Sequence, residues 1–253
     1  MSKLPKAYKF IDLSDYGRPI ARVISVTLKD TPVTAIHVTI AFVISGVLAV
    51  FCILKGYYIF AAIFLILKSI LDAADGELAR LKNKPSYTGR YLDSVSDILL
   101  NAIILLAIWH ITDVNIWYTI VAFLGLQLQG TLYNYYYVIL RNRYNGDTTS
   151  RIFENKTPKA MPGEHQVNVN ILFKLYKFLY GFFDKAIYLL DQNASTGRLL
   201  PNWLMTTLSI FGLGFQLLVI AIMLLLGLKT YIIPYFIITT LFIFGFVAIR
   251  KSL

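Results

Sequence analysis

Two apolar runs of the chain are joined by the segment DAADGELARLKNKPSYTGRYLDSVSD, residues 72–97, which carries four aspartates. Asp72 and Asp75 are three residues apart, and Asp93 and Asp97 are four apart, so each pair lies on one face of a helix, about one turn apart. The short connection between the pairs predicts two antiparallel helices whose facing carboxylates converge at one depth. Four carboxylates this close require a compensating cation.

The sequence around this segment is too apolar for a soluble domain. Hydrophobic residues make up 57% of the 253 residues and charged residues only 15%, against about 25% charged in average soluble proteins. A helix of about 20 predominantly apolar residues crosses the hydrocarbon core of a bilayer. Six stretches fit this length, namely 34–54, 57–70 with its polar continuation, 91–111, 116–140, 203–226 and 231–249. We therefore expect an all-α integral membrane protein with six transmembrane helices.

Basic residues are concentrated on one side of these six spans. The chain has a net charge of +10, and 21 of its 24 Lys and Arg residues fall before the first span, after the last, or in the second and fourth connections. By the positive-inside rule, both termini and the aspartate cluster face the cytoplasm. The charge is explained by topology and by attraction to anionic lipid, and nucleic acid is not expected as a partner.

Two further stretches mix apolar and charged residues. Residues 13–30 are interpreted as an amphipathic helix lying in the membrane interface, and residues 169–192 as an interfacial helix or helix pair. We therefore divide the chain into a cytoplasmic N-terminal interfacial segment, 1–33, and a six-helix membrane domain, 34–253, whose cytoplasmic loop 142–200 contains the second interfacial helix.

The residue types around the aspartates favour a site for a hard cation and a phosphate. Oxygen ligands favour Mg²⁺, Mn²⁺ or Ca²⁺ over zinc, and Mg²⁺ shares its coordination with substrate phosphates. Gly76 and Gly89 leave space for backbone and substrate, Ala79 permits close helix approach, and Arg80 can meet phosphate oxygens. A two-ion site at the interface would suit a substrate with a diphosphate.

These residues carry a resemblance to a known family. The segment is similar to the signature of the CDP-alcohol phosphotransferases, D-x2-D-G-x2-A-R-x8-G-x3-D-x3-D, and meets all eight fixed positions within 26 residues. The resemblance implies that Asp72, Asp75, Asp93 and Asp97 bind two divalent cations, Mg²⁺ or Mn²⁺, and that Asp97 is also the general base. It further implies a homodimer in the cell (inner) membrane.

The same resemblance implies the reaction and the donor site. Gly76, Ala79, Arg80 and Gly89 would bind the CDP part of a CDP-linked donor. An alcohol acceptor would attack the β-phosphorus and release CMP, and at least one of the two substrates would be a lipid, as in the synthesis of phospholipids or inositol phosphodiesters.

The acceptor stays open at the level of the sequence. The stretch before the first span resembles members that transfer inositol phosphate, whose acceptor needs a basic pocket, and Arg90, Arg141, Arg143 and Arg198 are the candidates. The absence of basic residues inside the spans 116–140 and 203–226 favours instead an uncharged hydroxyl, such as that of diacylglycerol.

Other polar residues of the spans have two interpretations each. Lys68, one turn before Asp72, either pairs with that carboxylate or snorkels to the interface. Gln127, Gln129 and Asn134 either line a substrate cavity or bond between helices.

Two other functions compete with the phosphotransferase. A membrane prenyltransferase also uses aspartates and Mg²⁺, but its aspartates form two motifs on distant helices. A divalent-cation transporter would need polar residues along a path through several spans, and 203–226 and 231–249 have almost none.

Overall fold

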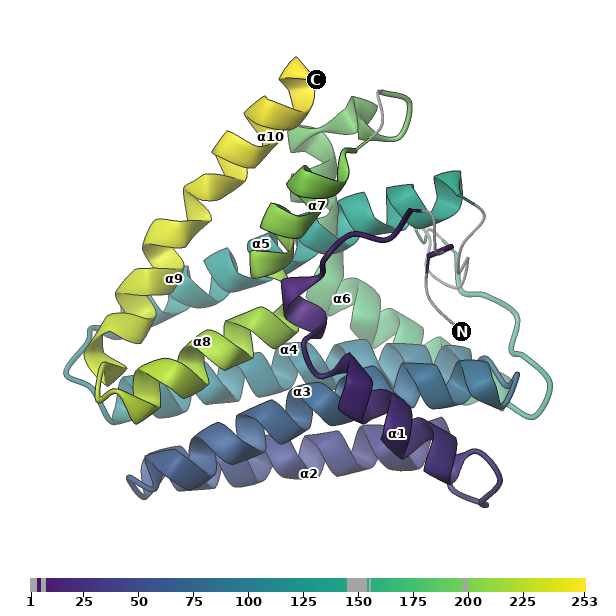
Figure 1. The fold of residues 1–253 in the computed structure, drawn as a ribbon, viewed down its shortest axis with the longest axis horizontal. Coiled ribbons are helices and arrows are strands. Elements are labelled where there is room, and N and C mark those ends of the chain that lie inside the picture. Colours follow the sequence, from purple (N-terminus) through teal and green to yellow (C-terminus); the bar gives the residue numbers. More distant parts are fainter. Residues whose placement is uncertain (1–3, 6–7, 145–153, 155, 198–199) are drawn as a thin grey trace.

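The computed structural model describes residues 4–5, 8–144, 154, 156–197 and 200–253, and all regular secondary structure within them is helical (Figure 1). The elements are η2 (Leu13–Asp15), α1 (Arg18–Leu28), α2 (Ala35–Leu54), α3 (Tyr58–Leu81), α4 (Tyr87–His110), α5 (Ile116–Arg143), α6 (Gln166–Leu190), η3 (Gln192–Ala194), α7 (Asn202–Leu208), η4 (Ser209–Phe211), α8 (Leu213–Leu225), η5 (Lys229–Tyr231), α9 (Ile232–Thr240) and α10 (Phe242–Ser252).

Three helical stretches in the described part of the chain are long and apolar enough to cross a membrane: Ala35–Leu54, Tyr87–His110 and Lys229–Ser252. A fourth arises if α7–η4 and α8, bent by 52° between Phe211 and Leu213, form one span. The all-helical membrane fold is thus as expected, but the count of six spans exceeds what these helices show. Helices α3 and α5 have 24 and 28 residues, long enough at about 1.5 Å per residue, but their charged and polar residues lower their apolar content.

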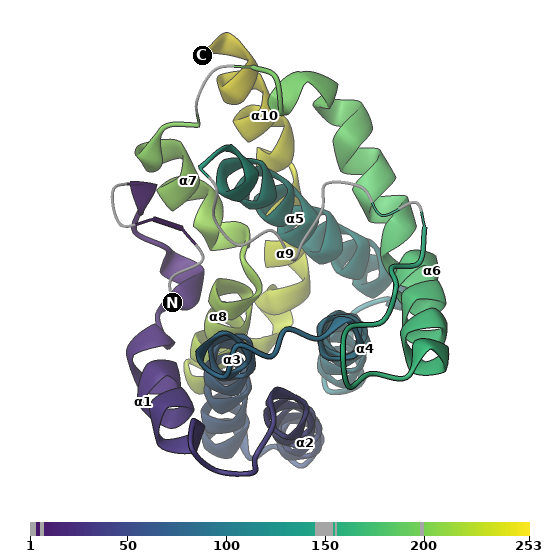
Figure 2. The same ribbon diagram turned by 90° about the vertical axis from the view of Figure 1, so that its right-hand side faces the viewer.

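Helix α2 packs against both α3 and α4, and α8 packs against α3. Figure 2 looks nearly along the axes of α2, α3 and α4, which are arranged as a triangle. A hydrophobic core of fully buried side chains joins this triangle to α5, α8 and α9, and Phe42, Leu65, Ile104, Leu217 and Phe236 represent it. This packing joins the two aspartate-bearing helices, α3 and α4, through α2.

The N-terminal segment packs on the aspartate-bearing half of α3. The Ser25 hydroxyl of α1 donates to the Ala74 carbonyl at 2.9 Å. At the end of α3, the Lys82 ammonium donates to the carbonyls of Thr31 and Val33 at 2.6 and 2.7 Å. The helix expected within 13–30 begins at Arg18 and packs against α3, which it crosses in the foreground of Figure 1.

The chain before α1 passes close to the break between η4 and α8. The Leu13 amide donates to the Ser209 hydroxyl at 2.8 Å. A Cβ added at Gly214 would lie 2.0 Å from the carbonyl oxygen of Ser14, and one at Gly212 would lie 2.3 Å from the Ser14 Cβ. Glycine at both positions permits this backbone contact.

A buried ion pair connects the last helix to the end of α6. The Arg250 guanidinium donates to the Asp191 carboxylate, with Nε 2.5 Å from Oδ2, and the Tyr136 hydroxyl of α5 donates to the same oxygen at 2.7 Å. Arg250 is 8% exposed and Asp191 1%, so each charge depends on the other for compensation.

The buried amide of Gln129 joins α5 to two other helices. The Gln129 amide donates to the Thr240 hydroxyl of α9 at 3.0 Å and accepts from the Gln216 amide of α8 at 3.2 Å. Gln127 is also buried, and Asn134 is exposed. For Gln129, bonding between helices is therefore the correct interpretation.

Candidate metal centre and active site

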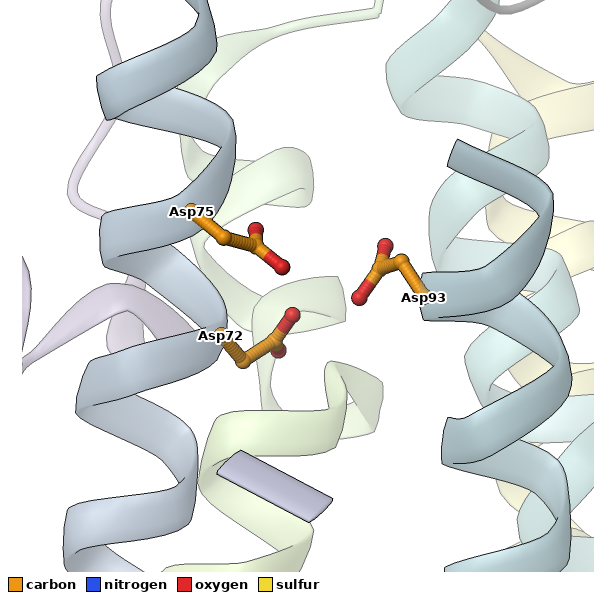
Figure 3. A group of neighbouring side chains, drawn as sticks. All are labelled: Asp72, Asp75 and Asp93. Carbon is orange, nitrogen blue, oxygen red and sulfur yellow. The ribbon is translucent and has the colours of Figure 1, made fainter. Parts of the chain in front are cut away.

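Three of the four predicted aspartates come together between α3 and α4. Asp72 and Asp75 of α3 point toward Asp93 of α4 (Figure 3). One carboxylate oxygen of each residue lies within 4.8 Å of the others. The one-turn spacing on α3 and the reversal of the chain over residues 82–86 produce this arrangement, as the sequence predicts.

The chemistry of these three carboxylates fits a hard divalent cation. None of the three makes an ion pair with a Lys or Arg side chain in the described residues. The Asp93 Oδ1 atom is buried and has no hydrogen-bond partner there. Oxygen donors without an ion-pair partner are the kind of ligands that Mg²⁺ and Mn²⁺ prefer.

Thr39 of α2 forms a hydrogen bond to one of the three aspartates. Its hydroxyl donates to the Asp75 Oδ2 atom at 2.6 Å, and both residues are buried. The bond orients one carboxylate oxygen toward α2 and leaves the other for the cluster. Nothing in the sequence around Thr39 indicates this contact, because the two residues are 36 positions apart.

The fourth aspartate has a different partner. Asp97 pairs with the ammonium of Lys68, a fully buried residue of α3. The expectation that Lys68 pairs with Asp72 or snorkels is therefore wrong: the helix rotation directs its side chain across to α4, where Asp97 lies one turn after Asp93. The group of three carboxylates excludes Asp97.

The residues expected to bind CDP surround the end of α3 and the start of α4. The guanidinium of Arg80 lies over Gly76, because a Cβ at Gly76 would be 3.3 Å from Nη1. The Gly89 amide donates to the Ser86 hydroxyl at 2.8 Å, which caps α4. Ala79 is half-buried on the same helix as Arg80. Gly89 therefore takes part in the N-terminal cap of α4, in addition to the space for substrate that the sequence predicts.

The three candidate basic residues for the acceptor that the structure describes each have a different partner. Arg90 pairs with the Glu154 carboxylate, Arg141 is buried and lies 5.1 Å from the centre of the Tyr137 ring, and Arg143 donates to the Gly197 carbonyl at 2.9 Å. The fourth candidate, at position 198, lies outside the described residues, as do 145–153, 155 and 199 of the predicted loop.

Glu164, a loop residue that the sequence analysis did not single out, hydrogen-bonds to the N-terminal end of α4. The Glu164 carboxylate accepts from the Ser86 hydroxyl and the Thr88 amide at 2.7 Å each, and from the Met161 amide at 3.0 Å. Burial opposes the charge, but these hydrogen bonds outweigh it and hold the pKa of Glu164 below its ordinary value. The loop before α6 is thereby attached to the helix that carries Asp93.

Helix α6 covers the α4 side of the site. The Tyr180 hydroxyl donates to the Ser94 carbonyl at 3.0 Å, and Tyr91 packs against Phe173 in the contact between the two helices. The side chain of Tyr180 also lies within electrostatic range of Asp93 and Asp97. The sequence did not indicate that the 169–192 helix approaches the aspartates.

Comparison with known families agrees with this geometry. A model of the CDP-alcohol phosphatidyltransferase family matches residues 33–159, half of the chain. The match covers α2 to α5 and all four aspartates. The chain therefore belongs to the CDP-alcohol phosphatidyltransferases, integral membrane enzymes that depend on divalent cations and use CDP-alcohol donors and alcohol acceptors. No curated protein matches the chain.

Proposed function

We propose that this protein transfers a substituted phosphate from a CDP-linked donor to an alcohol acceptor and releases CMP, in the synthesis of phospholipids or inositol phosphodiesters. The observation that carries the proposal is the convergence of Asp72, Asp75 and Asp93 from two helices without a basic side chain to pair them. At least one of the two substrates is a lipid, since the site lies in a membrane protein.

Asp72, Asp75, Asp93 and Asp97 would hold two divalent cations, Mg²⁺ or Mn²⁺. When bound, these cations supply positive charge to the diphosphate of the donor and to the departing CMP. Asp72 and Asp75 of α3 and Asp93 and Asp97 of α4 would hold them, and Thr39 orients Asp75 by its hydrogen bond.

Asp97 is proposed as the general base. It lies on α4 one turn beyond Asp93, beside the position where the diphosphate would be held. Its carboxylate would accept the proton of the acceptor hydroxyl while the hydroxyl oxygen bonds to the β-phosphorus. The bond from the β-phosphorus to the bridging oxygen breaks, and CMP leaves with that oxygen.

The donor would be bound by the residues that surround the end of α3. Arg80 can donate to the phosphates, and Gly76, Ala79 and Gly89 would leave room for the CDP moiety. Arg90, Arg141 and Arg143 remain proposals for an acceptor phosphate, and for Arg90 and Arg143 this role would require exchange of the Glu154 carboxylate or the Gly197 carbonyl for the ligand.

The decisive experiment offers purified protein a set of radiolabelled donors: CDP-diacylglycerol, CDP-ethanolamine, CDP-choline and CDP-inositol, each with candidate alcohols and Mg²⁺. CMP release with one donor identifies the substrate. Asp97→Asn should abolish turnover and retain much of the donor binding, while Asp113→Asn, an exposed aspartate between α4 and α5, should be unaffected. No CMP release from any donor would contradict the proposal, and full activity of Asp97→Asn would contradict the assignment of the base.

We further propose that α3 and α5 also cross the bilayer, for a total of six spans with both termini and the aspartates on the cytoplasmic side of the cell (inner) membrane. In this arrangement residues 1–33 form an interfacial segment, and 34–253 form the membrane domain with its 142–200 loop. The exposed Ile20, Val23 and Val26 of α1 support contact with lipid. A homodimer is proposed from the family, and light scattering of the purified protein tests it.

A further inference from the structure

Lys68 is a buried charged residue beside the aspartates that the proposed reaction does not use. Its side chain has no exposed surface, although a lysine is almost never buried without a partner. The ammonium pairs with Asp97 and lies 5.0 Å from the centre of the buried Phe42 ring. The side chain therefore connects α3 to α4 and α2 and does not reach water.

The charges that face Lys68 come from both aspartate-bearing helices. Besides Asp97, it lies within electrostatic range of Asp72 and Asp93, and the Tyr16 side chain approaches it from the N-terminal segment. One fixed positive charge thus faces a group of carboxylates, and it is nearest to the only one of the four that is absent from the group of three.

We propose that Lys68 is a resident counter-cation that occupies Asp97 and makes cation binding at the aspartates sequential. Lys68 acts as a positioning residue through Asp97, and the inference rests on the proposed function. Asp72, Asp75 and Asp93 form the preformed first site. A second cation reaches Asp97 only in competition with the Lys68 ammonium, so it binds more weakly than the first.

The physical reason is that one carboxylate cannot compensate two cations equally. In partly buried surroundings, unit charges a few Å apart interact strongly. If a cation binds the carboxylate of Asp97, the buried ammonium of Lys68 loses its compensating charge. Removal of the Lys68 charge should therefore strengthen the second site. Removal of the Asp97 charge alone should leave the ammonium to repel a cation at the first site.

The test is a double-mutant cycle read by Mn²⁺ binding, measured by electron paramagnetic resonance on the full chain in detergent. The variants are Lys68→Gln, Asp97→Asn, the double variant Lys68→Gln/Asp97→Asn, and Lys68→Arg, which keeps the charge. Lys55→Gln, an exposed lysine at the end of α2, is the matched control. Because the double variant removes both charges together, it is expected to fold even if a single variant does not.

We expect one tight and one weak Mn²⁺ site in the wild type, with the weak site strengthened about tenfold or more in Lys68→Gln and unchanged in Lys68→Arg. Asp97→Asn should weaken the first site about tenfold, and the double variant should restore it to within about threefold of the wild type.

Equal weakening of the first site in Asp97→Asn and in the double variant would overturn the proposal, as would two sites of equal affinity in the wild type. These results, together with CMP release by the wild type, would leave the proposed function intact. A wild-type protein that binds no Mn²⁺ would overturn both.

Discussion

At the scale of single residues, the contact between Thr39 and Asp75 offers the simplest test of how the first carboxylates are oriented. Both residues are buried, and the hydroxyl is the hydrogen-bond donor from α2 to that carboxylate. A hydrogen bond to a charged group contributes about 1.5–3 kcal/mol, so this one matters for a site whose ligands must converge.

We predict that Thr39→Val lowers Mn²⁺ affinity and CMP release by roughly tenfold to a hundredfold, from the energy of a charged hydrogen bond. Thr39→Ser, which keeps the hydroxyl, should stay within about threefold of the wild type on the same reasoning. Titration with Mn²⁺ and a CMP-release assay measure both. Equal losses in the two variants would show that the methyl packing, and not the hydrogen bond, is what the site needs.

A second prediction concerns Glu164 and pH. Hydrogen bonds from Ser86, Thr88 and Met161 hold the pKa of Glu164 below its ordinary value, against the opposing effect of burial. The charged form is therefore favoured in the folded protein. The contribution of the charged form to the free energy of folding is complete above the unfolded pKa of about 4.3. It is lost as the pH falls through the lower folded pKa.

The measurement is the mobility of a nitroxide at Lys159→Cys, an exposed position in the attached loop. The label should be immobilised at neutral pH and become mobile as the pH falls below the unfolded value of about 4.3 and through the lower folded pKa, whereas in Glu164→Ala it should be mobile at all pH values. Asp113→Ala is the control, since it lies between α4 and α5, away from the loop. A label with unchanged mobility in Glu164→Ala would show that the glutamate does not attach the loop.

At the scale of elements, the close contact between α8 and the segment before α1 requires glycine at position 214, because the Ser14 backbone occupies the space of a Cβ atom. A Cβ at Gly214 would lie 2.0 Å from the Ser14 carbonyl oxygen, whereas one at Gly245 of α10 would meet nothing within 4 Å. Both glycines lie in helices, where glycine is less favourable than alanine. They differ in what surrounds them.

We therefore predict opposite outcomes for the same substitution at these two positions. Gly214→Ala should displace residues 12–15 from α8 and lower the thermal unfolding midpoint by several degrees, as expected for a loss of about 1–3 kcal/mol. Gly245→Ala should be neutral or stabilising by up to about 1 kcal/mol, because alanine favours helix. A thermal melt in detergent measures both, and equal midpoints for the two variants would contradict the contact.

At the scale of the whole molecule, the proposed orientation follows from the placement of charge at the two ends of α3. Lys84 follows the aspartate-bearing end of α3, Lys55 precedes its other end, and both are exposed. In a Cys52→Ser background, a cysteine at position 84 should react with a membrane-impermeant reagent only from the cytoplasmic side, and one at position 55 only from the opposite side. Labelling of both from one side would show that α3 does not span the bilayer.

Much of the site could be predicted from local sequence, because helical periodicity assigns residues of one helix to a face. The spacing of Asp72 and Asp75 was sufficient to place both carboxylates on one side of α3, and the short connection was sufficient to bring Asp93 opposite them. The apolar runs likewise predicted helices α2 and α4 with nearly their observed bounds, since length and hydropathy are local properties.

The partners of the charged residues depend on tertiary structure. Periodicity does not specify how one helix is rotated against its neighbours, so the sequence could not show that Lys68 reaches Asp97, 29 positions away, or that Arg90 pairs with Glu154. The approach of α6 to the site depends on packing in the same way. Residue types and spacing therefore define a four-aspartate site in a helical membrane protein. Helix packing decides that three of these aspartates form one group and that Asp97 pairs with Lys68. The physical reason is that a buried ammonium requires a carboxylate partner, and only the packing of α3 against its neighbours buries Lys68.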